Sequence, residues 1–427
     1  MKYVIIGGSA AGISCIEAIR EKDKKSIIML ISDEEFPLYS RCLLTYLLAG
    51  TIKENGLLFK EKDFYEKNNV EAIHGVMAKS IDVKKKSVKL ADGKNIQFDK
   101  LLIATGARPK KISAPGVDKK GVFTLRYIED ARGIEKLLDK VKNVVILGGG
   151  LIGLRDAYAL RQRGKEINVI VKSPFILSQM VDKGAADIIA DALKSHGINI
   201  MTGVDAKEIK GNGEVKAILL DNGQLLDCEL IIIGKGVSPN TEIAKEAGIN
   251  VNAGIEVDGY LMTSEKDIYA AGDAAETIDM AEGVKRVNAL WPIAAEQGRL
   301  AGLNMAGEKR KYDGSISMNS IDFFGLASIS MGITKPEDKT FEILEKSGKS
   351  LYKKVVIKNN VIKGAVLVGS VNNAGIINVL LRKGIDVSSI KHKLLDDDLN
   401  YAAILPLVSK YADKFNEEEF KDTVITY

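Results

Sequence analysis

The sequence predicts an α/β protein in which one strand–turn–helix–strand unit occurs twice and an α+β region follows. Residues 4–12 recur in altered form as residues 144–153. Each copy joins a β-branched run to a helical pattern through a turn of small residues. The chain has 427 residues, 46% of them hydrophobic, and is therefore too long for a single hydrophobic core.

Charge and composition exclude several classes of protein. The 61 basic side chains nearly balance the 57 acidic ones, so neither nucleic acid nor a membrane is expected as a partner. No secretory signal precedes the first strand, and no apolar stretch approaches the ~20 residues that span a bilayer. We therefore expect a cytoplasmic protein. Three cysteines and three histidines, far apart in sequence, indicate neither disulfides nor a metal site.

The first unit runs from a strand at 3–6 through a helical pattern at 13–19 to a strand at 26–31. In its turn, Gly7 and Gly12 keep the outer positions of GxGxxG and Ser9 replaces the middle glycine. Small residues there let the backbone approach a pyrophosphate at the positive helix end. An ordinary glycine-rich turn remains an alternative. An acid about 20 residues on would bind a ribose hydroxyl, and Asp33 is preferred to Glu34.

The second unit has the full GxGxxG in Gly148, Gly150 and Gly153, between a strand at 144–147 and a helix at 154–163, with a further strand at 167–171. This context predicts an NAD(P)-binding turn. Each unit also carries a hairpin-like insertion, at 83–90 and 95–103 in the first and at 215–220 and 225–233 in the second. The parallel is a second sign of duplication.

The tail begins near residue 307. Runs at 352–358 and 361–369 flank a two-residue turn, Asn359 and Asn360, and residues 374–383 read as an amphipathic helix. We expect a first dinucleotide-binding domain at 1–112 and 246–310, an NAD(P) domain at 113–245 and a C-terminal domain at 311–427.

Residues 102–109 (LIATGARP) and 267–273 (DIYAAGD) resemble the two distal FAD signatures of the pyridine nucleotide-disulfide oxidoreductase superfamily. The resemblance implies two Rossmann-like dinucleotide-binding domains of three-layer ββα type, the NAD(P) domain inserted in the FAD domain, plus a C-terminal α+β domain. It gives Asp273 a hydrogen bond to a ribityl hydroxyl of FAD and places the following helix terminus at the pyrophosphate. A cap for a helix starting at Ala274 would also explain Asp273.

Further segments resemble the same superfamily. Residues 291–298 resemble its flavin-adjacent helix, and residues 234–240 resemble the stretch that borders the nicotinamide nucleotide. The expected FAD-binding residues are Gly7, Ser9, Ala10, Ala11, Gly12, Asp33, Glu34, Arg41, Cys42, Ala78, Ala104, Thr105, Gly106, Arg108, Gly272, Asp273, Ala274, Trp291, Pro292 and Gln297. Those expected to bind the nicotinamide nucleotide are Gly148, Gly150, Leu151, Ile152, Gly153, Arg155, Lys172, Gly234 and Gly236.

Two departures from the superfamily bear on the choice of nucleotide. Arg155 stands where an acid is usual, and Val171 and Lys172 replace the acid expected at the end of the second strand. Without that carboxylate the usual discrimination for a bare 2′-hydroxyl is lost. Arg155 or Lys172 could bind a 2′-phosphate, or both could be solvated, so NADH and NADPH remain open.

Residues 37–50 resemble two branches of the superfamily. In NADH oxidases, coenzyme A disulfide reductases and persulfide reductases a single redox cysteine occupies the position of Cys42, and an oxidised flavin beside it together with a basic neighbour such as Arg41 would lower its pKa. In rubredoxin reductases and nitrite-reductase-like flavoproteins the pattern is YSR and an apolar pair, with no cysteine required. The surrounding stretch resembles this second branch more closely, in which Arg41 contacts FAD and Cys42 is a packing residue.

The resemblance implies an oxidoreductase that transfers hydride from NAD(P)H to FAD and passes electrons to a small iron-sulfur protein, such as rubredoxin or ferredoxin. Basic clusters at 84–86, 110–111 and 119–120 could dock an acidic partner. The alternatives are a thiol-dependent oxidase or disulfide or persulfide reductase acting through Cys42, and a non-catalytic flavin-binding redox sensor. A homodimer built through the tail also remains open.

Overall fold

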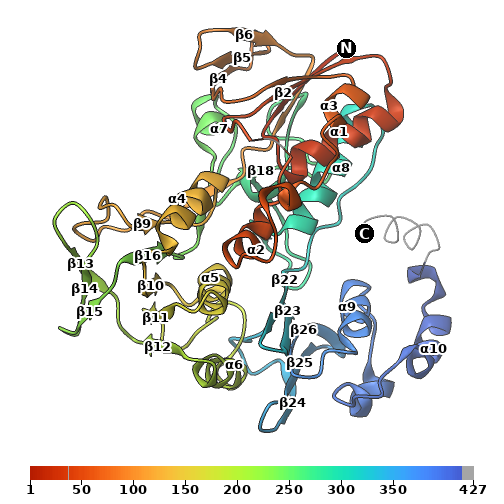
Figure 1. Cartoon of the computed structure of the whole chain (residues 1–427). Helices are drawn as coiled ribbons and strands as arrows, with labels where there is room; N and C mark the ends of the chain where they lie inside the picture. Colours follow the sequence, from red (N-terminus) through yellow and green to blue (C-terminus); the bar gives the residue numbers. More distant parts are fainter. Residues whose placement is uncertain (37, 416–427) are drawn as a thin grey trace.

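The computed structural model describes residues 1–36 and 38–415, so Pro37 and residues 416–427 of the expected C-terminal domain lie outside the described residues. Three five-stranded sheets organise the described part, two of them parallel and one antiparallel. Figure 1 shows the first sheet at the top, the second below it on the left and the C-terminal sheet at the bottom. This arrangement confirms the predicted fold class.

The first sheet has the order β19-β7-β1-β2-β3 and is parallel throughout. Its strands are β1 (Lys2–Ile6), β2 (Ile27–Ile31), β3 (Val70–Ile73), β7 (Lys100–Ile103) and β19 (Ile268–Ala270). The first four come from the N-terminal quarter of the chain, whereas β19 returns after the second sheet is complete. The second unit is therefore inserted between β7 and β19. Most positions of β1, β2 and β7 are buried, as both-face burial of a parallel sheet requires.

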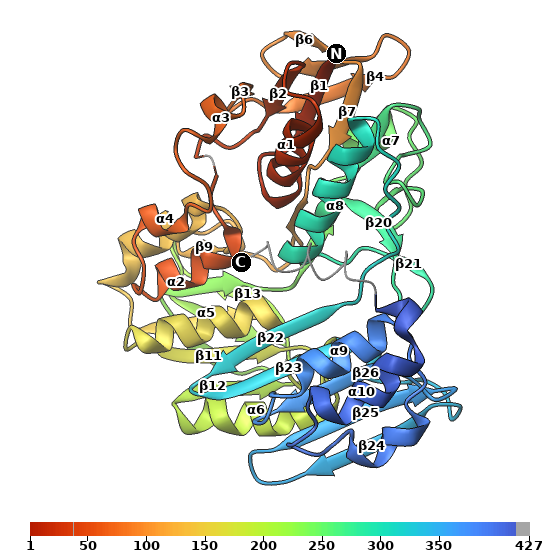
Figure 2. The same cartoon turned by 90° about the vertical axis from the view of Figure 1, so that its right-hand side faces the viewer.

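Two helices of the first unit, α1 (Ala10–Lys22) and α8 (Trp291–Met305), cross with their backbones in close approach. A Cβ atom on Gly298 would lie 2.0 Å from the carbonyl oxygen of Ala11, and one on Gly302 would lie 2.5 Å from that of Cys15. Figures 1 and 2 both show the helices side by side. Glycine is needed at both positions because no other side chain leaves room for the facing backbone.

The second sheet has the order β12-β11-β10-β16-β9. Its strands are β9 (Val122–Phe123), β10 (Asn143–Leu147), β11 (Glu166–Val171), β12 (Ile198–Thr202) and β16 (Leu230–Ile233), and its helices are α4 (Ile128–Leu138), α5 (Leu151–Gln162) and α6 (Lys183–Ser195). The expected strands at 144–147 and 167–171 and the helix at 154–163 are confirmed within one to three residues. Short helices α2 (Leu44–Leu48), α3 (Phe64–Lys67) and α7 (Glu242–Glu246) lie in the connections.

Each unit carries a three-stranded antiparallel sheet, which confirms the duplication. The strands are β4 (Ala78–Asp82), β5 (Ser87–Leu90) and β6 (Asn95–Gln97) in the first unit and β13 (Ala206–Lys210), β14 (Ala217–Leu220) and β15 (Leu225–Asp227) in the second. The expected single strands at 95–103 and 225–233 are wrong, because each run divides between a small-sheet strand and the following parallel strand, β7 or β16. The expected strand at 83–90 starts later, since residues 83–86 form a turn.

Smaller strand pairs connect these parts. They are β8 (Ala107–Pro109) with β17 (Val237–Pro239), and β20 (Ala275–Ile278) with both β18 (Ile255–Glu256) and β21 (Lys285–Arg286).

The prediction of a helix from Ala274 onward is wrong. Residues Gly272–Ala274 form a single 3-10 turn that leads directly into β20. Ile243 and Ala244 on α7 pack in the core of the first unit, so the chain re-enters that core just before residue 246.

The C-terminal sheet has the order β22-β23-β26-β25-β24. Its strands are β22 (Met318–Phe323), β23 (Leu326–Gly332), β24 (Glu342–Ser347), β25 (Tyr352–Lys358) and β26 (Val361–Val368). Asn359 and Asn360 form the expected turn, with φ of 52° and 60°. Along β26, Val366 and Val368 pack against the second unit, while alternate residues pack under α9 (Ala374–Arg382) and α10 (Tyr401–Lys410). The helix expected at 374–383 is confirmed as α9.

Asp182 fastens the C-terminal sheet to the second unit. It caps α6 by accepting a hydrogen bond from the Ala185 amide at 3.3 Å. Its other carboxylate oxygen accepts hydrogen bonds from the Tyr352 hydroxyl at 2.7 Å and the Lys354 ammonium at 2.6 Å, both on β25.

Within the described residues, every helix is too short or too polar to span a bilayer.

Asp156 on α5 is a buried carboxyl without a partner. It is fully buried, and neither of its carboxylate oxygens has a hydrogen-bond partner in the part of the chain that the structure describes. Burial raises the pKa of this carboxyl well above its ordinary value of 3.8, and the charge of Arg155 opposes the effect only in part. The folded state therefore holds a proton that the unfolded state loses.

Replacing Asp156 by Asn should raise the free energy of unfolding more at about pH 8 than at about pH 4, because only the carboxyl has to take up a proton on folding at the higher pH. Because the folded pKa is the higher one, the destabilisation by Asp156 grows as pH rises above about 4 and vanishes below it. Urea unfolding at about pH 4 and pH 8 measures the difference. Asp187→Asn, an exposed change on α6, is the control and should stay within about 0.5 kcal/mol. An equal gain at both pH values would contradict the explanation.

Candidate functional site

A cavity of about 1090 Å³ lies between the two units. It exceeds the 300–1,000 Å³ typical of a pocket for one small ligand. Both glycine-rich turns line it, together with most of the residues that the sequence predicts for cofactor binding. The predicted residues that do not line it are Gly12, Gly153, Ala274, Pro292 and Gln297.

Three of these five support the cavity wall from behind. A Cβ atom on Gly12 would lie 1.9 Å from the carbonyl oxygen of Gly7, and one on Gly153 would lie 2.3 Å from that of Gly148. The last glycine of each turn therefore lets a helix pack on a strand. The side-chain oxygen of Gln297 accepts a hydrogen bond from the Gly272 amide at 2.8 Å. These three residues therefore position the cavity wall, and their direct contact with a cofactor stays a prediction.

The first turn has the geometry of a pyrophosphate cradle. Gly7 has φ of 113°, and a Cβ atom there would lie 2.0 Å from the carbonyl oxygen of Ala104 at the end of β7. The N-cap residue of α1, Ser9, makes no side-chain capping bond, and the first helical turn holds no acid. The first amides of α1 therefore lie beside the cavity without a competing anion, as a bound diphosphate requires. These residues fit FAD.

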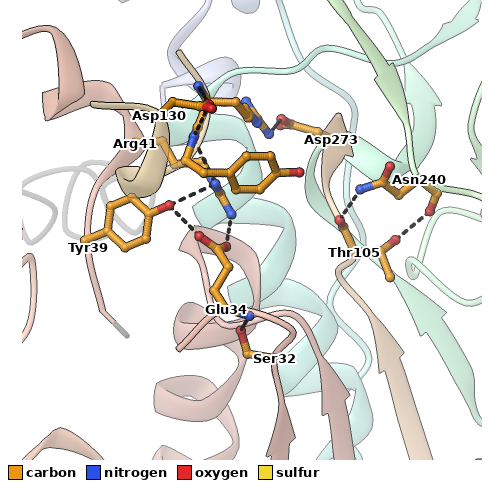
Figure 3. A network of polar contacts seen from close by, with 10 residues as sticks. Ser32, Glu34, Tyr39, Arg41, Thr105, Asp130, Asn240 and Asp273 are labelled. Carbon is orange, nitrogen blue, oxygen red and sulfur yellow. Dashed lines mark hydrogen bonds and ion pairs between the residues drawn. The ribbon is translucent and has the colours of Figure 1, made fainter. Parts of the chain in front are cut away.

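The two acids after β2 have different surroundings. Glu34 accepts hydrogen bonds from the Tyr39 hydroxyl at 2.5 Å and from the guanidinium of Arg41 (Figure 3). Asp33 is exposed on the cavity. The geometry therefore favours Asp33 for a ribose hydroxyl, as the sequence does, and assigns Glu34 to hold Arg41.

Asp273 pairs with an arginine that the sequence analysis did not single out. Its carboxylate lies 3.0 Å from the guanidinium of Arg126, and both side chains are less than one-fifth exposed. The Nε atom of Arg126 is buried and has no hydrogen-bond partner among the described residues. Asp130 fixes the segment by accepting hydrogen bonds from the Arg126 and Tyr127 amides at 2.8 and 3.1 Å (Figure 3). The only local signal was an acid three residues into a helix, which predicts a cap but not this contact.

Cys42 opens onto the cavity, as predicted, but its environment differs from that of a reactive thiolate. Burial raises the pKa of Cys42, and the charge of Arg155 and a hydrogen bond with Ser40 offset this only in part. The expectation that Arg41 lowers this pKa is wrong, because its guanidinium contacts Glu34, Tyr39 and the Arg126 carbonyl instead. Cys15 and Cys228 are buried in other cores, so neither can form a disulfide with Cys42.

The second turn repeats the geometry of the first. Gly148 has φ of 128°, and a Cβ atom there would lie 2.3 Å from the carbonyl oxygen of Gly234. The N-cap residue of α5 is Gly150, which has no side chain to occupy the first amides. Leu151 and Ile152 follow on the cavity wall. This site fits the pyrophosphate of a nicotinamide nucleotide.

A group of hydrogen bonds and one ion pair joins the two units along the cavity wall. The Thr105 hydroxyl donates to the Asn240 carbonyl at 2.6 Å, and the Asn240 side chain donates to the Thr105 carbonyl at 2.9 Å (Figure 3). Arg108 donates to the Asn240 side chain at 2.8 Å and pairs with Glu242. Thr105 and Arg108, predicted to bind FAD, therefore also hold the second unit in place.

Arg155 and Lys172, which the sequence offered together as candidates for a 2′-phosphate, lie in different surroundings. The Cζ atom of the Arg155 guanidinium lies 5.3 Å from the centre of the Tyr46 ring. The charge of Arg155 also opposes the rise in the pKa of the Cys42 thiol. Lys172 lies at the end of β11 with its Nζ atom 3.8 Å from a carboxylate oxygen of Asp205. Only Lys172 is near the strand end where an adenosine ribose is bound in this type of fold.

Comparison with known proteins assigns the class. Residues 1–298 match the family described as pyridine nucleotide-disulphide oxidoreductase, and residues 318–385 match the rubredoxin NAD+ reductase C-terminal domain. The chain therefore belongs to the pyridine nucleotide-disulphide oxidoreductase family. It is an FAD-dependent oxidoreductase that uses a nicotinamide nucleotide.

The similar proteins span several activities. An NADH oxidase of Methanocaldococcus jannaschii is 34% identical over 321 residues, which are 73% of this chain and 71% of that protein. An NADH-rubredoxin oxidoreductase of Clostridium acetobutylicum is 31% identical over 390 residues, 91% of this chain and 95% of that one. The solved structure of an NAD-dependent persulfide reductase from A. fulgidus superposes with a TM-score of 0.87 at 26% identity, covering 98% of this chain and 84% of the other.

Proposed function

We propose that this protein carries electrons from NAD(P)H through FAD to a small redox protein, an iron-sulfur protein of the rubredoxin or ferredoxin type, in the cytoplasm. The observation that carries the proposal is a single cavity bearing two dinucleotide cradles and one unpaired cysteine whose pKa is raised. A raised pKa makes a thiol a poorer nucleophile, whereas electron transfer needs no thiolate.

The residues around the cavity act by binding and orientation. The first turns of α1 and α5 would hold the two pyrophosphates, Asp33 would hold a ribose of FAD, and Asp273 would accept a hydrogen bond from a ribityl hydroxyl. Trp291 begins α8, with a proline in its first turn, and places the positive helix end at the cavity wall, where it stabilises negative charge. FAD, when bound, accepts hydride and releases electrons singly.

Charge at the cavity rim supports a protein acceptor. Lys79 and Lys110 line the cavity, and Lys111 follows Lys110 directly, so exposed cationic side chains lie on and next to its wall. The basic cluster at 84–86 offers less net positive charge to an acidic partner, because Lys85 and Lys86 form ion pairs with Asp82 and Asp267. Two of the similar proteins have an acceptor in their names, rubredoxin in one and persulfide in the other. We assign the rubredoxin type to this chain because residues 318–385 match the rubredoxin NAD+ reductase C-terminal domain, and the raised pKa of Cys42 agrees with this choice.

The second candidate function is reduction of oxygen, a disulfide or a persulfide through Cys42, which the position of this thiol on the cavity wall favours. Replacing Cys42 by Ser should leave reduction of rubredoxin or ferredoxin by NAD(P)H within about twofold of the parent enzyme. The control is Thr45→Ser, a comparable change on the same wall.

The measurement is an acceptor panel of rubredoxin, ferredoxin, oxygen, coenzyme A disulfide and polysulfide. A loss of more than about 100-fold for Cys42→Ser, with the control unaffected, would transfer the assignment to thiol chemistry. A redox sensor without catalysis would reduce no acceptor in the panel.

A further inference from the structure

We propose that the second nucleotide site selects NADPH over NADH, and that Lys172, Ser173 and Lys235 form the subsite for the 2′-phosphate. The inference deepens the proposed function, since it assumes that the second turn binds a nicotinamide nucleotide. It goes against the names of the similar proteins cited above, which specify NADH or NAD.

The end of β11 determines what faces the adenosine ribose. In a dinucleotide fold the strand after the first helix ends in a carboxylate that binds the 2′- and 3′-hydroxyls. Here that strand ends at Val171, which is buried and packs so closely on the turn that a Cβ atom on Gly149 would lie 2.7 Å from it. The position at which a carboxylate would normally repel a 2′-phosphate is therefore occupied by the apolar Val171, which packs against the glycine-rich turn.

The next residues supply positive charge and a hydroxyl. Lys172 and Ser173 follow Val171 directly, and both line the cavity, as does Lys235 beyond the end of β16. The Lys172 side chain is 81% exposed, so its ammonium can move to a ligand. Two ammonium groups and a hydroxyl on one wall are the donors that a phosphate monoester needs.

A carboxylate pairs with these lysines from outside the cavity lining. Asp205 pairs with Lys235 and lies 3.8 Å from Lys172, but it does not line the cavity. Burial alone would raise the pKa of Asp205, but the hydrogen bond from Lys235 and the charges of both lysines lower it overall. Asp205 therefore stays ionised and neutralises one lysine, leaving one net positive charge on the cavity side.

Binding of nucleotide fragments tests the subsite without relying on catalysis. Isothermal titration of the FAD-loaded protein should show 2′,5′-ADP binding about tenfold or more tightly than 5′-AMP, as one charge-assisted contact predicts. Lys172→Gln should reduce that ratio to less than about threefold and leave 5′-AMP within twofold. The control is Lys183→Gln on α6, which changes an exposed lysine that does not line the cavity.

Steady-state kinetics gives the second readout. Lys172→Gln should lower kcat/KM for NADPH about tenfold, mainly through KM, and leave that for NADH unchanged. Equal binding of both fragments, binding of neither, or equal losses with both nucleotides would overturn the inference. If 2′,5′-ADP binds selectively but neither nucleotide bleaches the flavin, the subsite stands and the proposed function fails.

Discussion

Replacing Asp273 by Ala should weaken the binding of FAD by about 10- to 100-fold. A hydrogen bond to a charged group contributes about 1.5–3 kcal/mol when the site is shielded from water, and the Asp273 carboxylate is only 16% exposed. The change also removes the ion-pair partner of the Arg126 guanidinium, whose Nε atom already lacks a hydrogen-bond partner among the described residues. The loss therefore combines a missing ligand contact with a less well positioned wall.

Titration of the apoprotein with FAD, followed by flavin fluorescence, measures this effect. Asp273→Asn keeps the shape and one acceptor oxygen, so it should lose less affinity than Asp273→Ala. Glu282→Ala is the matched control, because it removes a carboxylate from an arginine pair, that with Arg286, away from the cavity. If Asp273→Ala bound FAD within twofold of the parent protein, Asp273 would not be a ligand.

Replacing Gly298 by Val should destabilise the first unit by about 3 kcal/mol or more. The new Cβ atom would lie 2.0 Å from a backbone oxygen of α1, which cannot move as a flexible side chain would. The helices would have to separate, and α1 would carry the amides of its first turn away from the cavity. The variant should therefore lose both thermal stability and bound FAD.

The matched control for this prediction is Gly375→Ala on α9. No atom lies within 4 Å of the position that its Cβ would take, and the residue is helical. This change should stabilise the protein by about 0.5–1 kcal/mol, because alanine restricts the unfolded chain more than glycine does. Thermal unfolding of both variants and of the parent protein, each in the same excess of FAD, gives the comparison. Equal stability of Gly298→Val and the parent protein would show that α1 and α8 do not touch as described.

The sequence predicts the duplicated architecture because the relevant signals are local. A β-branched run, a glycine turn and an apolar period of 3.6 lie within about 20 residues in each unit, and both units form as expected. The divided strands escaped prediction for the same reason. Residues 95–103 contain apolar positions on both sides of Asp99 and Lys100, and this charged pair at the junction of β6 and β7 is too short a signal to mark a change of sheet.

Contacts between distant segments could not be predicted. Arg126 meets Asp273 across 147 positions, and Lys235 meets Asp205 across 30, and neither pair has a sequence signature. From the sequence, Arg155 and Lys172 were equivalent candidates for a 2′-phosphate. In the structure Arg155 contacts Tyr46, whereas Lys172 lies at the strand end where an adenosine ribose is expected. Side-chain direction depends on the packed surroundings, which a residue pattern does not contain.

Anaerobic mixing of the FAD-loaded protein with a nicotinamide nucleotide tests the central claim most directly. If two dinucleotide cradles share one cavity, a reduced nucleotide in the second reaches the flavin in the first, and the visible flavin absorbance should bleach within the turnover time, faster with NADPH than with NADH. Flavin that is retained by the protein but stays oxidised in an excess of both nucleotides would contradict the account.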